Sequence, residues 1–311
     1  MRNMKIVLIL FLGLFLLTAC QDEVKEKIDD DILQVITSFT LIEDMVKQIG
    51  GDFVETHNLV PIGTDPHEYD PLPEDIKIAT DADIIFYNGF NLEGNEEGGW
   101  IVKFADSIDK QLDDFYMLMD GAEPMYLEGH EGQPEHINPH TFLDPVLGIH
   151  MAENVRDALM ENLPDRKEEI TERAKEYIAE LEEIEQLYEE KINDIPEENR
   201  ILITSERAYQ YMAARYGLEE GYIFQVDTEE RGTPEQMTSL IEFIEEKEPP
   251  VLFVETNVDQ RSMETISDET GVEIYGEVFS DEIGKPGEEG DTYVKFLRYN
   301  IEMIHEGLTS K

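Results

Sequence analysis

Residues 165–194 read DRKEEITERAKEYIAELEEIEQLYEEKIND, and this stretch sets the architecture that we expect for the chain. Apolar side chains recur in it at alternating spacings of four and three on a strongly charged background, a pattern typical of an amphipathic helix. About 30 residues at 1.5 Å each make a helix of roughly 45 Å, which Ile195-Pro196 ends. A short coiled coil fits the same pattern, but the position of this stretch in the middle of an α/β chain favours a helix that connects two parts of the fold. The apolar positions are Ile170, Ala174, Tyr177, Leu181, Ile184, Tyr188 and Ile192.

On both sides of this helix, short β-rich apolar runs alternate with helical patterns. Such alternation is typical of a parallel sheet with helices on its faces. We therefore predict an α/β fold of two lobes, each a mainly parallel sheet flanked by helices, joined by one long rigid backbone helix. The expected strands are 32–39, 53–60, 83–87, 200–204, 251–254 and 273–279, and the expected helices are 41–50, 73–80, 234–247 and 290–308.

The composition excludes some classes of function. The chain has 311 residues, 41% of them hydrophobic, which is enough to bury a core. Its 72 acidic and 24 basic residues give a formal net charge of −48, and such a polyanion is repelled by phosphate backbones, so we expect no nucleic-acid partner. Because self-repulsion of this size is relieved by salt, we also predict an organism from a saline or alkaline habitat.

The N-terminus has the pattern of a lipoprotein signal. Arg2 and Lys5 precede the apolar run 6–17, and Leu17-Thr18-Ala19-Cys20 resembles a bacterial lipobox, with the chain's single cysteine at the required position. The alternative is an ordinary signal peptide with a chance cysteine. We predict lipidation of Cys20 and an anchor on the outer face of the cell membrane, in a Gram-positive bacterium. The expected segments are a signal peptide at 1–19, a lipidated tether at 20–31, an N-terminal lobe at 32–160, the linking helix at 161–195 and a C-terminal lobe at 196–311.

Four candidate metal ligands lie in loops. Three of them come after predicted strands, and the fourth, His140, follows a loop rich in Gly and Glu at 130–136. His67 and His140 precede the long helix, and Glu206 and Asp281 follow it, so a cleft between the lobes could bring all four together. Two imidazoles and two carboxylates suit a divalent transition metal. Position alone leaves this interpretation open, because loop histidines and acidic residues after strands are common in any chain as acidic as this one.

Five segments, in their order along the chain, resemble the metal-binding lipoproteins of ABC importers for manganese, zinc and iron, the cluster A-I solute-binding proteins. The resemblance implies two α/β lobes bridged by one helix, with a metal held between them by His67, His140, Glu206 and Asp281. The segments are VPIGTDPHEYDPLPEDI at 60–76, NPHTFLDPVLGI at 138–149, ITSERAYQYMAARYG at 203–217, LFVETNVDQRSM at 252–263 and VFSDEIGKPGEEGDTY at 278–293.

The same resemblance indicates the cargo and the partners. Members that resemble zinc binders usually have a third histidine where this chain has Glu206, so the ligand set favours Mn²⁺, with Fe²⁺ and Zn²⁺ as alternatives. The function implied is capture of the metal outside the membrane and delivery to a cognate ABC permease and its ATPase, by a monomer that is not an enzyme. A metalloenzyme and an adhesin are the alternatives from other classes. Arg207 departs from the family, where a small residue usually follows the glutamate.

Overall fold

The computed structural model describes residues 32–94, 98–127, 132, 136–226 and 232–310. The described residues from Leu33 onward form one compact unit. The predicted signal peptide, Cys20 and the tether lie outside the described residues. Among the helices that the structure describes, none combines the length and the apolar character needed to cross a bilayer.

The N-terminal lobe is built on a four-stranded parallel sheet in the order β2-β1-β3-β4. β1 lies inside the sheet, with Val35 opposite Thr56 on one side and Ile84 on the other. Parallel neighbours need crossover connections, and helices supply them here. The strands are β1 (Leu33–Phe39), β2 (Val54–Val60), β3 (Ile84–Tyr87) and β4 (Tyr116–Met117), and the helices are α2 (Thr40–Gly50), α3 (Pro73–Thr80), α4 (Trp100–Ser107) and α5 (Pro145–Asn162).

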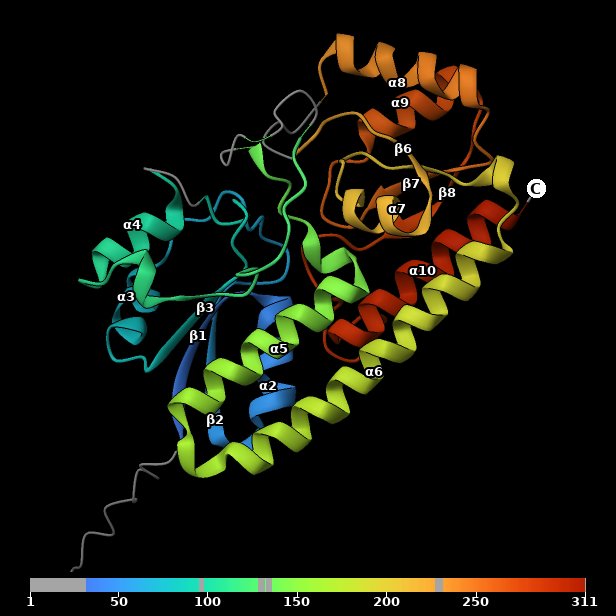
Figure 1. Cartoon of the computed structure of the whole chain (residues 1–311). Helices are drawn as coiled ribbons and strands as arrows, with labels where there is room; N and C mark the ends of the chain where they lie inside the picture. Colours follow the sequence, from blue (N-terminus) through green and yellow to red (C-terminus); the bar gives the residue numbers. More distant parts are fainter. Residues whose placement is uncertain (1–31, 95–97, 128–131, 133–135, 227–231, 311) are drawn as a thin grey trace, which may run out of the picture. The chain divides into compact units, whose positions relative to one another are not determined.

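The C-terminal lobe contains two short parallel ladders, one of β5 with β6 and one of β7 with β8. β5 also contacts β7, so the two ladders are neighbours. The strands are β5 (Ile201–Ile203), β6 (Glu219–Gly221), β7 (Leu252–Glu255) and β8 (Ile274–Val278), and the helices are α7 (Gln210–Tyr216), α8 (Pro234–Lys247), α9 (Arg261–Thr270) and α10 (Tyr293–Thr309). Together with the first lobe, this is the predicted two-lobe α/β fold (Figure 1).

The long helix α6 (Lys167–Asp194) runs along both lobes (Figure 1). It begins two residues later than the predicted start because Pro164–Arg166 form a separate 3-10 turn. α6 contacts α2 and α5 of the first lobe and α7 and α10 of the second. All seven apolar positions predicted from the sequence are buried, and the Tyr188 hydroxyl donates to the Leu297 carbonyl of α10 over 2.9 Å. The helix is therefore a strut that packs on both lobes.

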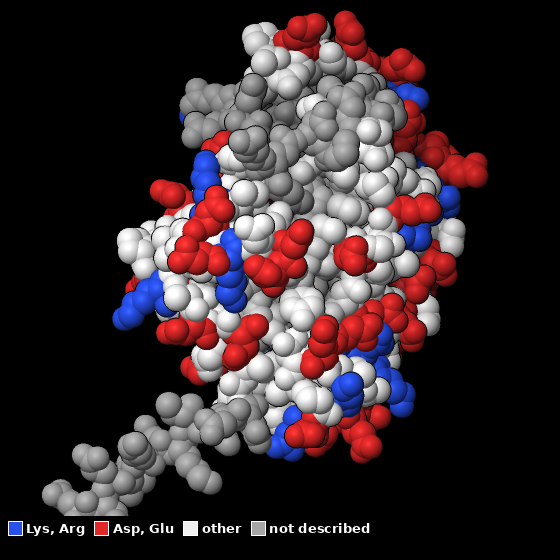
Figure 2. Space-filling view, turned by 60° about the vertical axis from the view of Figure 1, so that its left-hand side comes forward, with Lys and Arg blue, Asp and Glu red and all other residues white. Residues whose placement is uncertain are grey.

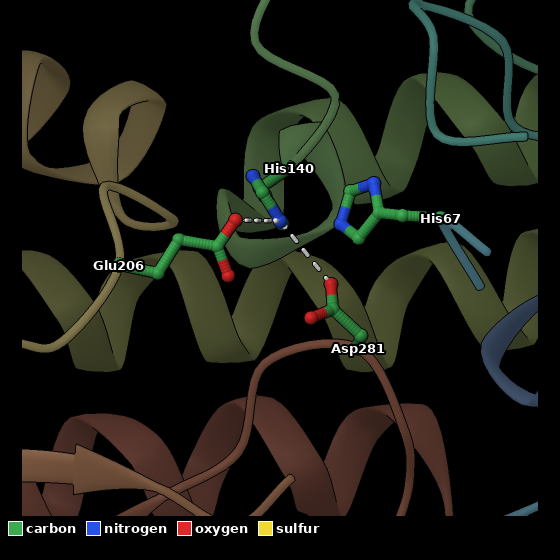
Figure 3. A group of neighbouring side chains, drawn as sticks. All are labelled: His67, His140, Glu206 and Asp281. Carbon is green, nitrogen blue, oxygen red and sulfur yellow. Dashed lines mark ion pairs between the residues drawn. The ribbon is translucent and has the colours of Figure 1, made fainter. Parts of the chain in front are cut away.

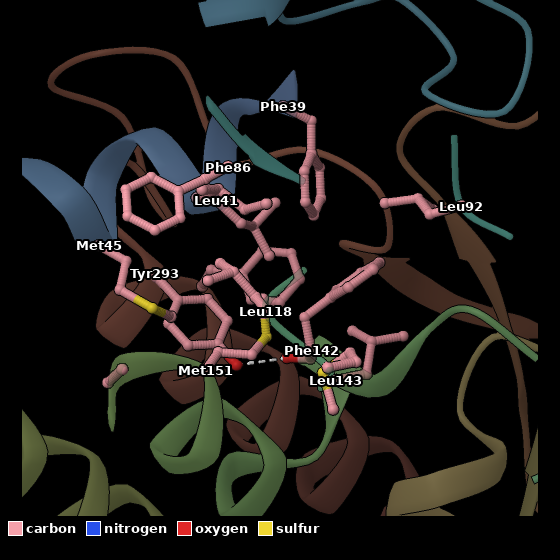
Figure 4. Packing of buried hydrophobic residues seen from close by; sticks show 14 of the residues in the cluster. Phe39, Leu41, Met45, Phe86, Leu92, Leu118, Phe142, Leu143, Met151 and Tyr293 are labelled. Atoms are coloured by element: carbon pink, nitrogen blue, oxygen red, sulfur yellow. Dashed lines mark hydrogen bonds between the residues drawn. The ribbon is translucent and has the colours of Figure 1, made fainter. Parts of the chain in front are cut away.

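The main hydrophobic core continues from one lobe into the other. Phe39, Phe86 and Phe142 of the first lobe belong to the same buried cluster as Tyr293 of α10 (Figure 4). Phe296 of α10 belongs to this cluster as well. A second, smaller cluster lies within the C-terminal lobe, between its strands and helices α8 and α9. Because the larger core crosses the boundary, the lobes are joined by buried apolar surface as well as by the chain.

Acidic side chains are spread over the surface. On the face drawn in Figure 2, Asp and Glu lie scattered across the molecule with fewer Lys and Arg among them. The solvent side of α6 follows the same pattern, because most of its glutamates are exposed. The net charge therefore lies largely in water, where salt can screen it.

Candidate metal site

The structure brings all four predicted ligands together. One potential ligand atom from each of His67, His140, Glu206 and Asp281 lies within 4.8 Å of every other, and the four side chains converge on one point (Figure 3). His67 follows β2, Glu206 follows β5 and Asp281 follows β8. These three positions follow the rule that functional side chains gather beyond the carboxyl ends of parallel strands.

His140 is completely enclosed, as Glu206 is. It lies just before the 3-10 turn Thr141–Leu143 and is fully buried. Its Nδ1 is 2.9 Å from Asn138 Oδ1, which also accepts a hydrogen bond from the His140 backbone N–H at 3.0 Å. Its Nε2 lies 3.3 Å from Glu206 Oε1 and 3.3 Å from Asp281 Oδ1. Asn138 thus fixes the ring so that Nε2 faces both carboxylates.

The segment that carries His140 is bound to the C-terminal lobe at several points. Asn138 Nδ2 donates to the Arg207 carbonyl at 2.8 Å, and the Tyr211 hydroxyl donates to the Asn138 carbonyl at 2.8 Å. Next to it, the buried Asp144 pairs with Arg215 of α7 at 2.6 Å. These contacts hold a ligand of the first lobe in register with the ligands of the second.

The charges of the site favour a cation. Burial alone would lower the pKa of His140, but the Glu206 and Asp281 carboxylates outweigh it and raise that pKa to about 9. Burial opposes ionisation of Asp281, yet His140 holds the pKa of this carboxyl well below its usual range. Burial lowers the pKa of His67 to about 4, so its imidazole is neutral near pH 7. In the metal-free site, the His140 imidazolium therefore faces the two carboxylates, and the imidazole of His67 is neutral.

His67 lies on the solvent side of the site. Among the described residues its buried Nε2 has no hydrogen-bond partner, and its ring meets the His140 ring edge-on, with centroids 5.3 Å apart. His67 lines a cavity of about 530 Å³ together with His136, Asn91 and Gln225. The other three ligands are almost completely buried, so His67 is the ligand through which the cavity borders the site.

Two neighbours of the ligands have structural roles. Asp65 accepts a hydrogen bond from the His67 backbone N–H at 2.7 Å, which makes the turn that presents the imidazole. Arg207, the departure from the family pattern, pairs with Glu220 at 3.3 Å and lies over the Tyr222 ring, 5.2 Å from its centroid. Its guanidinium is therefore engaged by an acid other than the neighbouring ligand.

The sequence gives no direct indication of three residues that hold the ligands. Asn138 orients His140. Glu255, at the end of β7, accepts hydrogen bonds from the backbone N–H groups of Ser205 and Glu206 at 3.1 and 2.9 Å. Asn257 donates to Asp281 Oδ2 at 3.1 Å. All three stand in the segments quoted for the resemblance, but their roles depend on contacts across the fold.

A family model described as "ZnuA: Zinc-uptake complex component A periplasmic" matches residues 35–307. Among similar curated proteins is the manganese ABC transporter substrate-binding lipoprotein PsaA of Streptococcus pneumoniae, 39% identical over 311 residues that cover 99% of each chain. The iron ABC transporter substrate-binding lipoprotein MtsA of Streptococcus pyogenes is 39% identical over 308 residues, also covering 99% of each.

Solved structures share the fold. The periplasmic zinc binding protein TroA from Treponema pallidum has a TM-score of 0.78 at 27% identity, covering 89% of this chain and 99% of the other. An Mn-bound periplasmic metal binding protein from Candidatus Liberibacter asiaticus has a TM-score of 0.78 at 23% identity, with the same coverage. These similarities agree with the two lobes and the long helix described above.

Proposed function

This chain belongs to the ZnuA family of metal-binding substrate-binding proteins of ABC importers, and we propose that its own cargo is Mn²⁺, held by His67, His140, Glu206 and Asp281. Proteins of this kind bind and deliver a substrate and are not enzymes. The observation that carries the proposal is the convergence of two imidazoles and two carboxylates within 4.8 Å. Burying two carboxylates is costly even beside a protonated imidazole, and a bound metal cation would offset that cost.

The donor set favours manganese over zinc. Carboxylate oxygens are ligands that suit Mn²⁺, whereas closed Zn²⁺ sites are usually four-coordinate and rich in nitrogen and sulfur. Relatives at 39% identity are named for manganese and for iron, and TroA is described as a zinc binding protein. Fe²⁺ and Zn²⁺ are therefore the alternatives for the same mechanism, and the Irving–Williams order makes Zn²⁺ a strong competitor.

The protein works with a permease and an ATPase, as substrate-binding lipoproteins of ABC transporters do. We infer that it does so as a monomer anchored through lipidated Cys20 on the outer face of the cell membrane of a Gram-positive bacterium. The relatives named as lipoproteins of streptococci support the anchor. We retain the proposed division into signal peptide 1–19, tether 20–31, lobes 32–160 and 196–311, and linking helix 161–195.

The test of the cargo is a titration of metal-free protein with Mn²⁺, Fe²⁺ and Zn²⁺, alongside the metal content of protein purified without chelator. The variant Glu206→His replaces a charged oxygen donor with a neutral nitrogen, so it should lower the ratio of Mn²⁺ to Zn²⁺ affinity. Glu176→His makes the same substitution at an exposed position of α6 that is not one of the four ligands, and this variant should bind as wild type. Binding of one Zn²⁺ without measurable binding of Mn²⁺ would show that the proposed cargo is wrong.

A further inference from the structure

The turn after β7 supplies no ligand, yet it lies against a carboxylate of the site. Glu255 ends the strand, and the Thr256 backbone N–H donates to the Val278 carbonyl at 3.0 Å, which joins this turn to the end of β8. Asn257 therefore comes to lie beside Ser280 and Asp281, more than twenty residues further along the chain. This turn belongs to the segment LFVETNVDQRSM at 252–263, which the four-ligand site leaves unexplained.

The contacts fix which way the Asn257 amide points. Ser280 Oγ lies 2.7 Å from Asn257 Oδ1 and donates to it. Asn257 Nδ2 lies 3.1 Å from Asp281 Oδ2 and donates to it. Turning the amide over would place its oxygen against a carboxylate oxygen, which is repulsive, so the chemistry of the neighbours selects one orientation.

This hydrogen bond makes the two oxygens of Asp281 different. Oδ2 faces the Asn257 amide at 3.1 Å and the Ser280 hydroxyl at 3.1 Å. Oδ1 faces His140 Nε2 at 3.3 Å, toward the other ligands (Figure 3). The carboxylate is thus held so that one oxygen is engaged by the protein and the other is directed to the point where the four side chains converge.

We propose that Asn257 is a positioning residue that orients the Asp281 carboxylate toward the point where a metal would be held. This inference rests on the proposed function, since it assigns a role toward the same cargo. Asn257 does not touch the metal; it acts through the carboxylate that does. Partners of this kind orient metal ligands, and their loss typically lowers metal affinity by about 10–100-fold.

The test uses two substitutions of Asn257 in the full chain. Asn257→Ala removes the donor without changing charge. Asn257→Asp keeps the size and the oxygen that accepts from Ser280, but replaces the donor with a second acceptor. The matched control is Gln260→Glu, because Gln260 Nε2 also donates to a carboxylate, Glu277 Oε1 at 2.6 Å, on the exposed surface of the same lobe.

We expect both Asn257 variants to bind Mn²⁺ about 10–100-fold more weakly than wild type, with an altered electron paramagnetic resonance spectrum of the bound Mn²⁺. A change in spectrum reports the coordination of the ion, which a loss of general stability would not alter. Gln260→Glu should keep the wild-type affinity and spectrum. If either Asn257 variant binds Mn²⁺ as wild type with an unchanged spectrum, or if Asn257→Asp binds more tightly, the proposal is overturned.

Two further measurements keep the result interpretable. Thermal unfolding of the metal-free variants checks that they fold, and if the Asn257 variants do not, Ser280→Ala removes the hydroxyl that orients the amide and should weaken Mn²⁺ binding in the same direction. Wild-type protein that binds Zn²⁺ and not Mn²⁺ would contradict the proposed cargo alone. The affinities of the same variants for Zn²⁺ would then test Asn257, with equal affinities overturning its role.

Discussion

Gly148 of α5 and Tyr293 of α10 are in contact, and the substitution Gly148→Ala, which adds a Cβ atom, tests this contact. A Cβ at Gly148 would overlap the Tyr293 hydroxyl and lie 3.0 Å from Cε1 and Cζ of its ring. That hydroxyl donates to the Phe142 carbonyl over 2.6 Å (Figure 4). Gly148→Ala must therefore displace the Tyr293 ring, and with it a hydrogen bond two residues from the ligand His140.

The expected size follows from three contributions. Overpacking a close-packed interior costs about 1–3 kcal/mol. Weakening the buried hydrogen bond costs about 1 kcal/mol, whereas replacing glycine with alanine inside a helix gains about 0.5–1 kcal/mol. We therefore expect Gly148→Ala to lower the free energy of unfolding by about 1–3 kcal/mol.

A double-mutant cycle isolates the contact. Tyr293→Phe removes the hydroxyl that the new Cβ would overlap but keeps the ring carbons at 3.0 Å, so Gly148→Ala should cost less in that background, with a coupling energy above about 0.5 kcal/mol. The assay is urea unfolding of metal-free protein followed by circular dichroism, with equal slopes required for the comparison. If the two substitutions add within about 0.5 kcal/mol, the Tyr293 hydroxyl does not limit the space at Gly148 and the reasoning is refuted.

Three other perturbations have definite signs. Burial raises the pKa of Glu93 from 4.5 to about 7, so between these pH values the folded state holds a proton that the unfolded chain releases. The free energy of unfolding of metal-free protein should therefore fall as pH rises through this range, and it should fall less steeply in Glu93→Gln. Urea unfolding at several pH values measures both slopes. Arg215→Met leaves the buried Asp144 without its partner at 2.6 Å, and because the arginine is 38% exposed we expect a loss of about 1–2 kcal/mol in urea. Because the net charge is −48, the melting temperature of metal-free protein should rise from low salt to 1 M NaCl, where the Debye length is about 3 Å.

Each of these has a matched control. Glu176→Gln removes an exposed carboxyl and should leave the pH dependence unchanged; a wild-type slope in Glu93→Gln would contradict the assignment. Lys175→Met breaks an exposed pair with Glu172 and should cost little, so an equal cost for Arg215→Met would argue against a buried contribution. A flat or falling melting temperature in salt would count against surface self-repulsion. It would favour acids that instead concentrate cations, which predicts a salt-dependent rate of metal association.

Much of the fold can be predicted because long amphipathic patterns report burial directly. The seven apolar positions of α6 are buried as predicted, and the predicted helix 73–80 coincides with α3. The pattern could not show that Pro164–Arg166 form a separate 3-10 turn, since its first apolar position is Ile170 and the start of the helix before it is not marked. β4 and β6 have only two and three residues, too few for any periodicity, and α7, at seven residues, is also short.

The site depended on more than pattern. Their positions after strands suggested His67, Glu206 and Asp281 as ligands, but position alone could not distinguish them from other loop histidines and acidic residues. The family resemblance identified these residues among the many candidates. Asn257 and Glu255 could not be predicted, because their roles arise where β7 passes between the ends of β5 and β8. Such contacts depend on the order of strands in space, which local sequence does not specify.

The core that crosses the lobe boundary has a consequence for how the protein folds. The cluster shared by Phe142 and Phe296 leaves neither half with a complete interior of its own. Each half produced alone would expose the apolar surface that the other covers, and would be prone to aggregate. The stabilisation that a bound ion supplies should therefore reach the shared cluster in both lobes, whereas α8 and α9 pack on the separate cluster of the C-terminal lobe.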